Sequence, residues 1–292
     1  MLESKGSIET FPFFYHARML ADGHRLKCFR TAINQTIRDN YQVVDLGGGT
    51  GVLTQILTQK TNGLITYIDI SKASSVVAKK LNMNISKNIQ YINKNSFDVQ
   101  LETQPNVLVT ETLGYFGIDE GIVESCYDFC IRHPSINKLI PNKVSLKYQF
   151  LHLPELNTEF ELLLSSYTSQ FGTISSELIS EFEILFCNLI RTKFIKLDEV
   201  KICSEPELIK KFNLGIDNSS NIDYFIDCNE YQNANVIHFY FEAELNNNVK
   251  LSNYIFEPKT HWFHSYAGIP KGIKKGQLTF EPTERKLKLR WK

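Results

Sequence analysis

VVDLGGGTG, residues 43–51, is the stretch of sequence that decides the fold of the first half of the chain. In it a short apolar run stops at glycines, and a helical pattern follows over residues 51–59. Similar apolar runs occupy residues 41–46, 64–70, 89–93 and 107–111, and a second helical stretch occupies residues 72–81. Strands that alternate with helices predict a parallel, doubly wound sheet of the Rossmann-like kind.

The second half of the chain has a different pattern. One helical stretch interrupts several alternating, strand-like runs, which lie at residues 144–153, 194–202, 236–245, 250–256, 278–280 and 285–291. The sequence LIPN, residues 139–142, is expected to break the chain between the halves, and residues 217–235 to form an exposed excursion. We therefore expect residues 1–141, with a helix over 15–38, to form a Rossmann-like domain. Residues 142–292 are expected to form a β-barrel-like domain with a helical insertion.

The composition excludes several function classes. The chain has 292 residues, with 32 Lys plus Arg and 32 Asp plus Glu, so no basic excess marks a nucleic-acid binder. We find no apolar stretch of membrane-spanning length and no secretory signal, and therefore expect a cytoplasmic protein without a membrane partner. The six cysteines are expected to be reduced thiols. No metal is expected, because no Cys/His set has zinc-type spacing.

The glycine loop predicts a nucleotide-like cofactor. Glycines allow the backbone to turn tightly and to approach a ligand closely. The spacing Gly47-x-Gly49-x-Gly51 differs from the G-x-G-x-x-G pattern of dinucleotide sites. It resembles the first motif of class I S-adenosylmethionine methyltransferases, which implies S-adenosyl-L-methionine as the cofactor.

Two later strand ends support this prediction. Asp69 ends the second predicted strand, where a carboxylate can accept hydrogen bonds from both ribose hydroxyls. Because a NAD site also uses such an acid, the glycine spacing rather than Asp69 chooses between the cofactors. Ser96 and Phe97 follow the third strand, and we expect them near the adenine, with Phe97 either covering the ring or packing in the core.

Two acids near the fourth strand predict the acceptor. Glu111 ends that strand, and Glu120 follows it after a loop with two glycines, Gly114 and Gly117. Such a loop can fold back and bring both carboxylates to one pocket, where they repel each other unless a cation lies between them. A guanidinium fits this place because it is planar, permanently charged and carries its donors in a fork.

Here the sequence resembles the protein arginine methyltransferase family. The loop from Glu111 to Glu120 is similar to the family's double-E loop, with Gly-Tyr between the acids. MLADGHR, residues 19–25, resembles its M-L-x-D-x-x-R helix, and THW, residues 260–262, matches its T-H-W loop. With the glycine loop, these motifs occur in the family's order, so the resemblance covers most of the chain.

The resemblance implies roles for single residues. Arg25 would bind the carboxylate of S-adenosylmethionine, Met19 would pack near the reactive methyl group, and Asp45 would help to hold the cofactor's amino group. Asp22 and His261 would pair across the two domains and support catalysis with Glu111 and Glu120. Residues expected to contact the acceptor, besides the two glutamates, are Tyr115 and Trp262.

The sequence departs from the family at several places. The family's N-terminal lid carries aromatic residues on a helix, whereas here Pro12 interrupts the aromatic residues, which are Phe11, Phe13, Phe14 and Tyr15. Thr112 and Leu113 stand where the family often has Trp-Met, and Ile122 stands where a second methionine is common. Because these residues shape the space around the acceptor nitrogen, the number and position of methyl groups stay open.

The helical stretch at about 155–190 lies where the family places its dimerisation arm, which implies a homodimer. The apolar residues that would cover the partner are Phe160, Leu163, Leu164, Phe182, Leu185, Phe186 and Leu189. The alternative is that the helices pack only on their own barrel.

Several functions are compatible with these motifs. The first is S-adenosylmethionine-dependent methylation of arginine in a protein or peptide. The second is methylation of free arginine or a small guanidino metabolite, since the compact chain has no added recognition domain. A non-catalytic cofactor-binding scaffold and a methyltransferase for another nucleophile are weaker alternatives, because neither needs a repelling pair such as Glu111 and Glu120.

Overall fold

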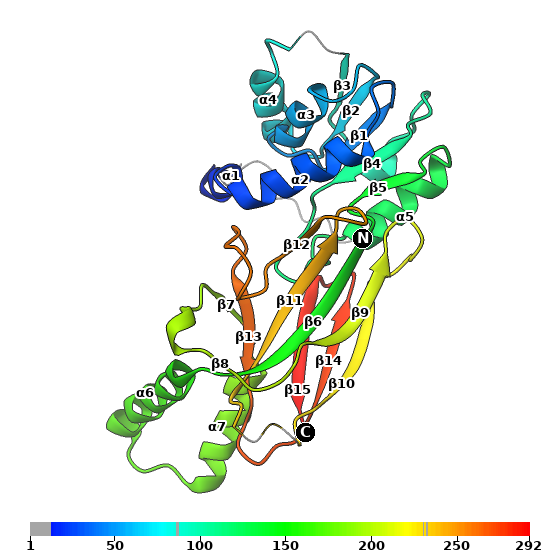
Figure 1. The fold of residues 1–292 in the computed structure, drawn as a ribbon. Coiled ribbons are helices and arrows are strands. Elements are labelled where there is room, and N and C mark those ends of the chain that lie inside the picture. The colour runs from blue at the N-terminus through cyan, green and yellow to red at the C-terminus, as the bar shows by residue number, and fades with distance from the viewer. Residues whose placement is uncertain (1–12, 86–87, 230, 232) are drawn as a thin grey trace.

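The computed structural model describes residues 13–85, 88–229, 231 and 233–292 of the chain, with the side chains of residues 13–16 and 199 left out. Figure 1 shows two parts, an α/β part at the top and an elongated antiparallel β part below it, with two helices at the far end. This confirms the predicted fold class, a Rossmann-like domain followed by a β-barrel-like domain with a helical insertion.

The first part is built on five parallel strands in the order β3-β2-β1-β4-β5. The strands are β1 (Val43–Leu46), β2 (Ile65–Ile68), β3 (Ile89–Ile92), β4 (Val107–Thr110) and β5 (Lys138–Ile140). β1 is central, with Val43 opposite Ile65 on one side and Val107 on the other. Every residue of β1, β2 and β4 is buried, as expected for parallel strands covered on both faces. β5 corrects one prediction, because it includes residues 139 and 140 of the chain break that was expected over 139–142.

Helices connect and cover these strands. They are α1 (Phe13–Leu20), α2 (Gly23–Thr36), α3 (Val52–Thr58), α4 (Lys72–Leu81), the short 3₁₀ helix η1 (Ser96–Asp98) and α5 (Ile122–Arg132). The single helix predicted over residues 15–38 is wrong, since the chain breaks between α1 and α2. Asp22 causes the break: its side chain accepts a hydrogen bond from the backbone N–H of Arg25 and caps α2.

The second part consists of two antiparallel sheets. One sheet has the strand order β7-β13-β11-β6-β8, with β12 paired to β11 and β9 paired to β6. The other sheet has the strand order β10-β14-β15. The strands are β6 (Lys143–His152), β7 (Arg191–Lys193), β8 (Lys201–Ile202), β9 (Glu207–Asn213), β10 (Ile222–Asp227), β11 (Val236–Glu244), β12 (Lys250–Ser252), β13 (His264–Gly268), β14 (Lys275–Glu281) and β15 (Lys286–Trp291).

Parts of this sheet pattern differ from the prediction. β10 lies inside residues 217–235, which were expected to be an exposed excursion, and pairs with β14 through Ile222 opposite Phe280. The strand expected over 194–202 is wrong for most of its length, because the 3₁₀ helix η2 (Leu197–Glu199) precedes the two-residue β8. β9 and β13 were not predicted.

The helical insertion forms α6 (Pro154–Phe171) and α7 (Ser176–Asn188), which project from the barrel end (Figure 1). α7 is anchored to the barrel, since Cys187 is buried against Gly268 and the backbone N–H of Trp291 donates to Asn188. α6 exposes much of its apolar surface, including Leu162 and Phe171.

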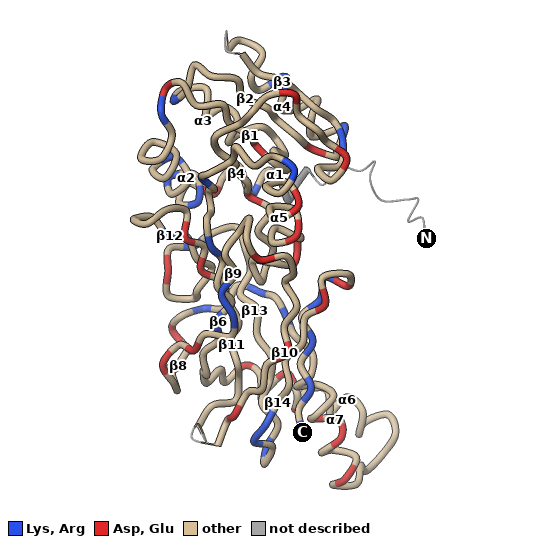
Figure 2. Tube along the Cα trace, turned by 90° about the vertical axis from the view of Figure 1, so that its right-hand side faces the viewer, with Lys and Arg blue, Asp and Glu red and all other residues tan. Residues whose placement is uncertain are grey.

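A hydrophobic core runs through both parts of the molecule. It includes Phe29 of α2, Val109 of β4 and Phe239 of β11. Lys, Arg, Asp and Glu are interspersed over both parts, so neither part carries a single sign of charge (Figure 2). Among the described residues, no helix is both long and apolar enough to cross a bilayer.

The substitution Phe239→Ala tests how much the barrel core contributes to the free energy of unfolding. Its side chain is fully buried, so Phe239→Ala leaves a cavity and is expected to lower the free energy of unfolding by about 3–5 kcal/mol. Urea denaturation followed by circular dichroism measures this. The control is Phe225→Ala, because Phe225 is 66% exposed and its loss should cost within about 0.5 kcal/mol. Equal effects of the two substitutions would contradict the described core.

Candidate cofactor and acceptor sites

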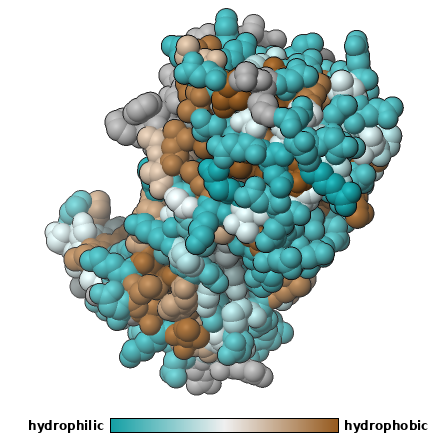
Figure 3. Space-filling model, turned by 45° about the horizontal axis from the view of Figure 1, so that its top comes forward, coloured by the Kyte–Doolittle hydropathy of each residue, from teal (hydrophilic) through white to brown (hydrophobic). Residues whose placement is uncertain are grey.

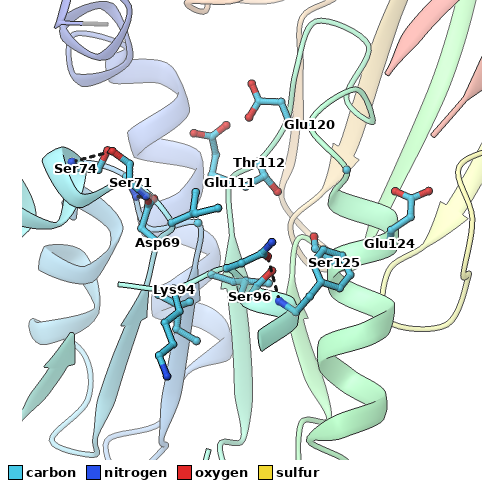
Figure 4. A pocket seen from close by; sticks show the side chains of 18 of the residues that line it. Asp69, Ser71, Ser74, Lys94, Ser96, Glu111, Thr112, Glu120, Glu124 and Ser125 are labelled. Atoms are coloured by element: carbon cyan, nitrogen blue, oxygen red, sulfur yellow. Dashed lines mark hydrogen bonds between the residues drawn. The ribbon is translucent and has the colours of Figure 1, made fainter. Parts of the chain in front are cut away.

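A pocket of about 500 Å³ opens where the parallel strands end. Strands of an open α/β sheet present ligands at this edge. The residues that line it are Met19, Leu46, Gly47, Gly49, Ile68, Asp69, Ile70, Ser71, Ser74, Lys94, Asn95, Ser96, Phe97, Glu111, Thr112, Glu120, Gly121, Glu124, Ser125, Pro282 and Arg285. Figure 4 shows this pocket, with Asp69 and Ser71 near one end and Glu111 and Glu120 near the other.

The glycine loop forms one wall of the pocket. Gly47 and Gly49 have positive φ angles of 68° and 52° and line the pocket. Gly51, at φ 77°, lies behind the wall at the start of α3, where a side chain would overlap Ala78 of α4. Glycine adopts such angles most readily, and a Cβ at Gly47 or Gly51 would also overlap a neighbour, so the sequence pattern reflects a real constraint of the backbone.

Asp69 holds this loop. One carboxylate oxygen accepts a hydrogen bond from the backbone N–H of Gly49 at 2.8 Å, and the other accepts from Ser71 N–H at 2.7 Å. Asp69 also lines the pocket. The carboxylate is thus positioned by the loop at the place where a ribose is expected, and its contact with the sugar stays a prediction.

Ser96, Phe97 and Met19 also lie where the sequence suggested. Ser96 and Phe97 sit in η1 on the pocket wall, and Met19 approaches from the end of α1. The ring of Phe97 is 46% exposed, so it is not a core residue and its apolar surface faces the pocket. Together with the glycine loop and Asp69, these side chains fit a nucleoside that carries a short polar chain.

Asp45 lies behind the pocket rather than in it. Its side chain is fully buried and accepts a hydrogen bond from the Thr54 hydroxyl at 2.6 Å. Burial raises the pKa of Asp45 to about 6. Asp45 is not among the lining residues. Its hydrogen bond ties β1 to α3, and its contact with a cofactor amino group stays a prediction.

The loop between Glu111 and Glu120 folds back as predicted. Asp119 holds the folded loop, because its carboxylate accepts hydrogen bonds from the backbone N–H groups of Tyr115 and Phe116 at 3.0 and 2.9 Å. Gly114 makes room for this carboxylate, since a Cβ there would lie 2.3 Å from it. Sequence reasoning missed this role of Asp119, because its carboxylate bonds back to N–H groups that precede it, whereas the common Asp turn motif bonds to N–H groups that follow.

Both glutamates face the same end of the pocket (Figure 4). Burial raises the pKa of Glu111 to about 8, opposed by Arg25 and aided by Glu120. The Glu120 side chain is open to the pocket, yet protein atoms surround its carboxylate. This enclosure, together with Asp119, raises the pKa of Glu120 to about 7. A cation between the two carboxylates would favour the ionised form of both.

Arg25 pairs with residues of the protein, and its expected contact with a cofactor carboxylate stays a prediction. Its buried guanidinium forms an ion pair with one carboxylate oxygen, Oε2, of Glu111 and donates to the backbone carbonyl of Met19 at 2.8 Å. Arg25 does not line the pocket. The second oxygen, Glu111 Oε1, is buried and has no hydrogen-bond partner among the described residues. The ion pair therefore leaves one acceptor atom of Glu111 for another donor.

Asp22 and His261 pair across the two parts of the molecule, as predicted. Asp22 Oδ2 accepts from both the backbone N–H and Nδ1 of His261, at 2.8 and 2.9 Å. Burial raises the pKa of Asp22, but hydrogen bonds from His261 and from Arg25 N–H outweigh it and keep the pKa below its usual value. Neither side chain lines the pocket, so the pair acts on the site through α2.

Trp262 lies beside the acidic loop and Tyr115 lies within it, and neither residue lines the pocket. Trp262 is buried, and its indole N–H donates to the carbonyl of Leu113 at 2.7 Å. Tyr115 packs against Phe263, with ring centroids 6.0 Å apart. The THW segment thereby fixes the acidic loop from the barrel side, and direct acceptor contacts of Trp262 and Tyr115 stay predictions. The lid residues Phe11 and Pro12 and the side chains of Phe13, Phe14 and Tyr15 lie outside the described part.

Asp22→Ala tests the link between the two parts. It removes the α2 cap and the partner of a buried histidine, and we expect the free energy of unfolding to fall by about 2–4 kcal/mol. Chemical denaturation measures the loss. Asp198→Ala, at an exposed carboxylate, serves as the control and should change stability by less than about 0.5 kcal/mol. A stability of Asp22→Ala equal to that of the control would refute the link.

Comparisons with known proteins give matches in sequence and in fold, although no known family profile matches the chain. It is 29% identical over 144 residues to protein arginine N-methyltransferase 1.6 of Arabidopsis thaliana, which covers 45% of this chain and 19% of that protein. It is 28% identical over 117 residues to protein arginine N-methyltransferase 1 of Dictyostelium discoideum, covering 39% and 34%. The aligned regions thus span well under half the length of these relatives.

Solved structures match over nearly the whole chain. Arabidopsis thaliana protein arginine methyltransferase 10 superposes with a TM-score of 0.72 at 14% identity, covering 96% of this chain and 91% of that one. A crystal structure of PRMT6 superposes with a TM-score of 0.71 at 15% identity, covering 96% and 98%. Sequence and fold together confirm that this chain resembles the protein arginine methyltransferase family.

Proposed function

We propose that this chain is an S-adenosylmethionine-dependent N-methyltransferase that acts on the guanidinium of arginine in a protein or peptide. The observation that carries the proposal is the pair of carboxylates, Glu111 and Glu120, at the end of a nucleoside-sized pocket. One oxygen of Glu111 is left without a partner there. Such a pair suits a planar cation with several N–H donors better than any neutral acceptor.

The cofactor part of the proposal rests on the other end of the pocket. The glycine loop, the Asp69 carboxylate and the exposed Phe97 ring offer a backbone cradle, a hydroxyl acceptor and a stacking surface. The Trypanosoma brucei PRMT1 enzyme–prozyme complex, which superposes on this chain with a TM-score of 0.71 at 17% identity, was solved with AdoHcy. When bound, S-adenosylmethionine supplies a methyl group on a positively charged sulfur.

The chain's own residues orient and prepare the acceptor. Glu111 Oε1 and the Glu120 carboxylate can each accept hydrogen bonds from one guanidinium, which fixes the direction of the attacking nitrogen. Alignment of this nitrogen with the methyl group can contribute up to about 7–11 kcal/mol. Methylation of a protonated guanidinium must release one proton. Glu120, with its pKa raised to about 7, is suited to take it.

The relatives support the proposed substrate class. Both sequence relatives named above are protein arginine N-methyltransferases, and this favours a protein or peptide over free arginine or a small guanidino metabolite. The residues that depart from the family around the acceptor, Thr112 and Ile122, lie at and behind the pocket wall. They are the positions at which we expect the number of transferred methyl groups to be decided.

Glu111→Gln and Glu120→Gln test the acceptor site. Glutamine keeps the shape but removes the charge that orients the guanidinium, and we expect kcat for an arginine peptide to fall about 10²–10⁴-fold. Mass spectrometry of the methylated peptide measures the rate. Glu281→Gln, at an exposed carboxylate at the end of β14, is the matched control and should keep full activity. Undiminished transfer by a folded Glu120→Gln enzyme would exclude this acceptor role.

We also propose that α6 and α7 form a dimerisation arm that covers the cofactor domain of a second copy. Large apolar residues are exposed on the arm and also around α4 of the cofactor domain, which the arm of a second copy would cover. Those on the arm are Leu162, Leu163, Phe171, Leu185 and Leu189, and those around α4 are Ile70, Val76, Leu81 and Met83. Figure 3 shows hydrophobic side chains gathered in patches on an otherwise polar face. Patches of this kind in a soluble fold mark interaction surfaces.

Charge placed on the arm should prevent this dimer. We expect Phe171→Asp combined with Leu185→Asp to convert the dimer to a monomer in sedimentation equilibrium, because an unpaired carboxylate would be buried in the contact. Ile216→Asp is the control, since Ile216 is 73% exposed and lies outside the arm. A wild-type chain that sediments as a monomer at micromolar concentration would contradict the arm's role.

A further inference from the structure

The turn between β14 and β15 brings a charged residue from the end of the chain to the acceptor site. Arg285 lies in this turn and lines the pocket together with Pro282. Its φ angle is 54°, and among the described residues it is the one non-glycine residue with a positive φ. A glycine or asparagine is the usual choice at such a position. The turn geometry therefore gives no reason for an arginine.

The side chain of Arg285 reaches the start of α5, directly beside Glu120. Its Nη2 and Cζ atoms lie 3.3 and 3.6 Å from the position that a Cβ on Gly121 would take. Gly121, with φ 81°, follows Glu120 and caps α5. A larger residue at 121 would push the guanidinium away, so the glycine and the arginine form a matched contact.

No described carboxylate lies within 4.0 Å of the Arg285 guanidinium as an ion-pair partner. Arg285 and Glu120 line the same pocket without forming an ion pair, so the guanidinium acts on this carboxylate through its charge. The charged and titratable groups that surround the Glu120 carboxylate from the loop, β4, α5 and the hairpin are Glu111, Tyr115, Asp119, Glu124 and Arg285. Arg285 is the one cation in this set.

The two acids of the acceptor site are thus balanced from opposite sides. Glu111 is neutralised by Arg25, which comes from α2 in the first part of the molecule. We propose that Arg285 is a positioning residue of the acceptor site, which balances the charge of Glu120 from the barrel side and keeps this carboxylate ready for the substrate guanidinium. The inference rests on the proposed function for the identity of that substrate.

The electrostatics agree with this geometry. Burial and the neighbouring Asp119 raise the pKa of Glu120, and Arg285 is the group that lowers it. Arg285 lowers the pKa of Asp119 in the same way. Loss of the guanidinium should therefore raise the pKa of Glu120 further, so that more of the enzyme holds a protonated, neutral Glu120 near pH 7. The acidic limb of the pH–rate profile would then move to higher pH.

Arg285→Gln and Arg285→Gly test the proposal, with Arg285→Lys to restore the charge and Arg290→Gln as the control. The glycine variant removes the charge and suits the positive φ, so a fold defect cannot explain its effect. Arg290 is exposed on β15 outside the pocket, and its replacement removes one charge from the same hairpin. The first readout is the titration of the Glu120 carboxyl carbon by NMR in protein labelled at glutamate, with Glu120→Gln identifying the signal.

We expect the Glu120 titration midpoint to rise in Arg285→Gln and Arg285→Gly, and to stay near the wild-type value in Arg285→Lys and Arg290→Gln. The second readout is kcat/KM for an arginine peptide, which should fall about 3–10-fold at pH 6.5 in the uncharged variants and recover at pH 9.

An unchanged midpoint in Arg285→Gln would overturn the proposal even if the enzyme is active. A gain in kcat/KM would also overturn it, because Arg285 would then act as a competing occupant of the site. If the midpoint shifts but no variant or wild type methylates the peptide, the proposed function fails and the inference about Arg285 stands.

Discussion

The buried Asp22 carboxylate is the contact on which the site depends. It caps α2 through Arg25 N–H and receives two hydrogen bonds from His261, which belongs to the loop before β13. The helix that it caps carries Arg25 to Glu111. A single chain of polar contacts therefore leads from the barrel, through the cap of α2, to the first acid of the acceptor site. Because each member is buried, loss of one leaves a polar or charged group without its partner in the interior.

Charge balance is the second constraint. Burial is the main cause that raises the pKa values of Glu111 and Glu120, to about 8 and about 7, so each carboxylate is easily protonated near neutral pH unless a cation lies beside it. Arg25 and Arg285 oppose this from the two parts of the molecule, and an incoming guanidinium completes the neutralisation. A cation with several donors would complete the charge balance of this site, and this is the physical basis for proposing arginine as the acceptor.

The sequence predicted those features that are local and periodic. Each of these features is visible within one stretch of sequence. They are the glycine loop, the alternating apolar runs of the first half and the ends of β11 and β15. The pairing of Asp22 with His261 was also anticipated, through the family resemblance. By contrast, β10 and β13 depend on partner strands distant in sequence, and the short β9 and β10 are rich in polar residues that hide their alternation.

Several site residues have roles that depend on tertiary contacts, which the sequence pattern does not display. The ion pair of Arg25 with Glu111 was not predicted, because it joins two residues that are far apart in the sequence. Asp119 and Arg285 could not be assigned because one acts on backbone N–H groups of its own loop and the other reaches the pocket from the last hairpin of the chain. Trp262 was placed at the acceptor, whereas its indole supports the acidic loop from behind.

The most direct test of the account is to incubate the wild-type chain with methyl-labelled S-adenosylmethionine and to offer arginine peptides and free arginine in parallel, with fragmentation mass spectrometry to locate the label. The account predicts label on a guanidinium nitrogen of the peptides. Label on free arginine alone would contradict the proposed substrate class. Absence of label from both, while the chain binds the cofactor, would contradict the central claim that Glu111 and Glu120 hold a guanidinium for methyl transfer.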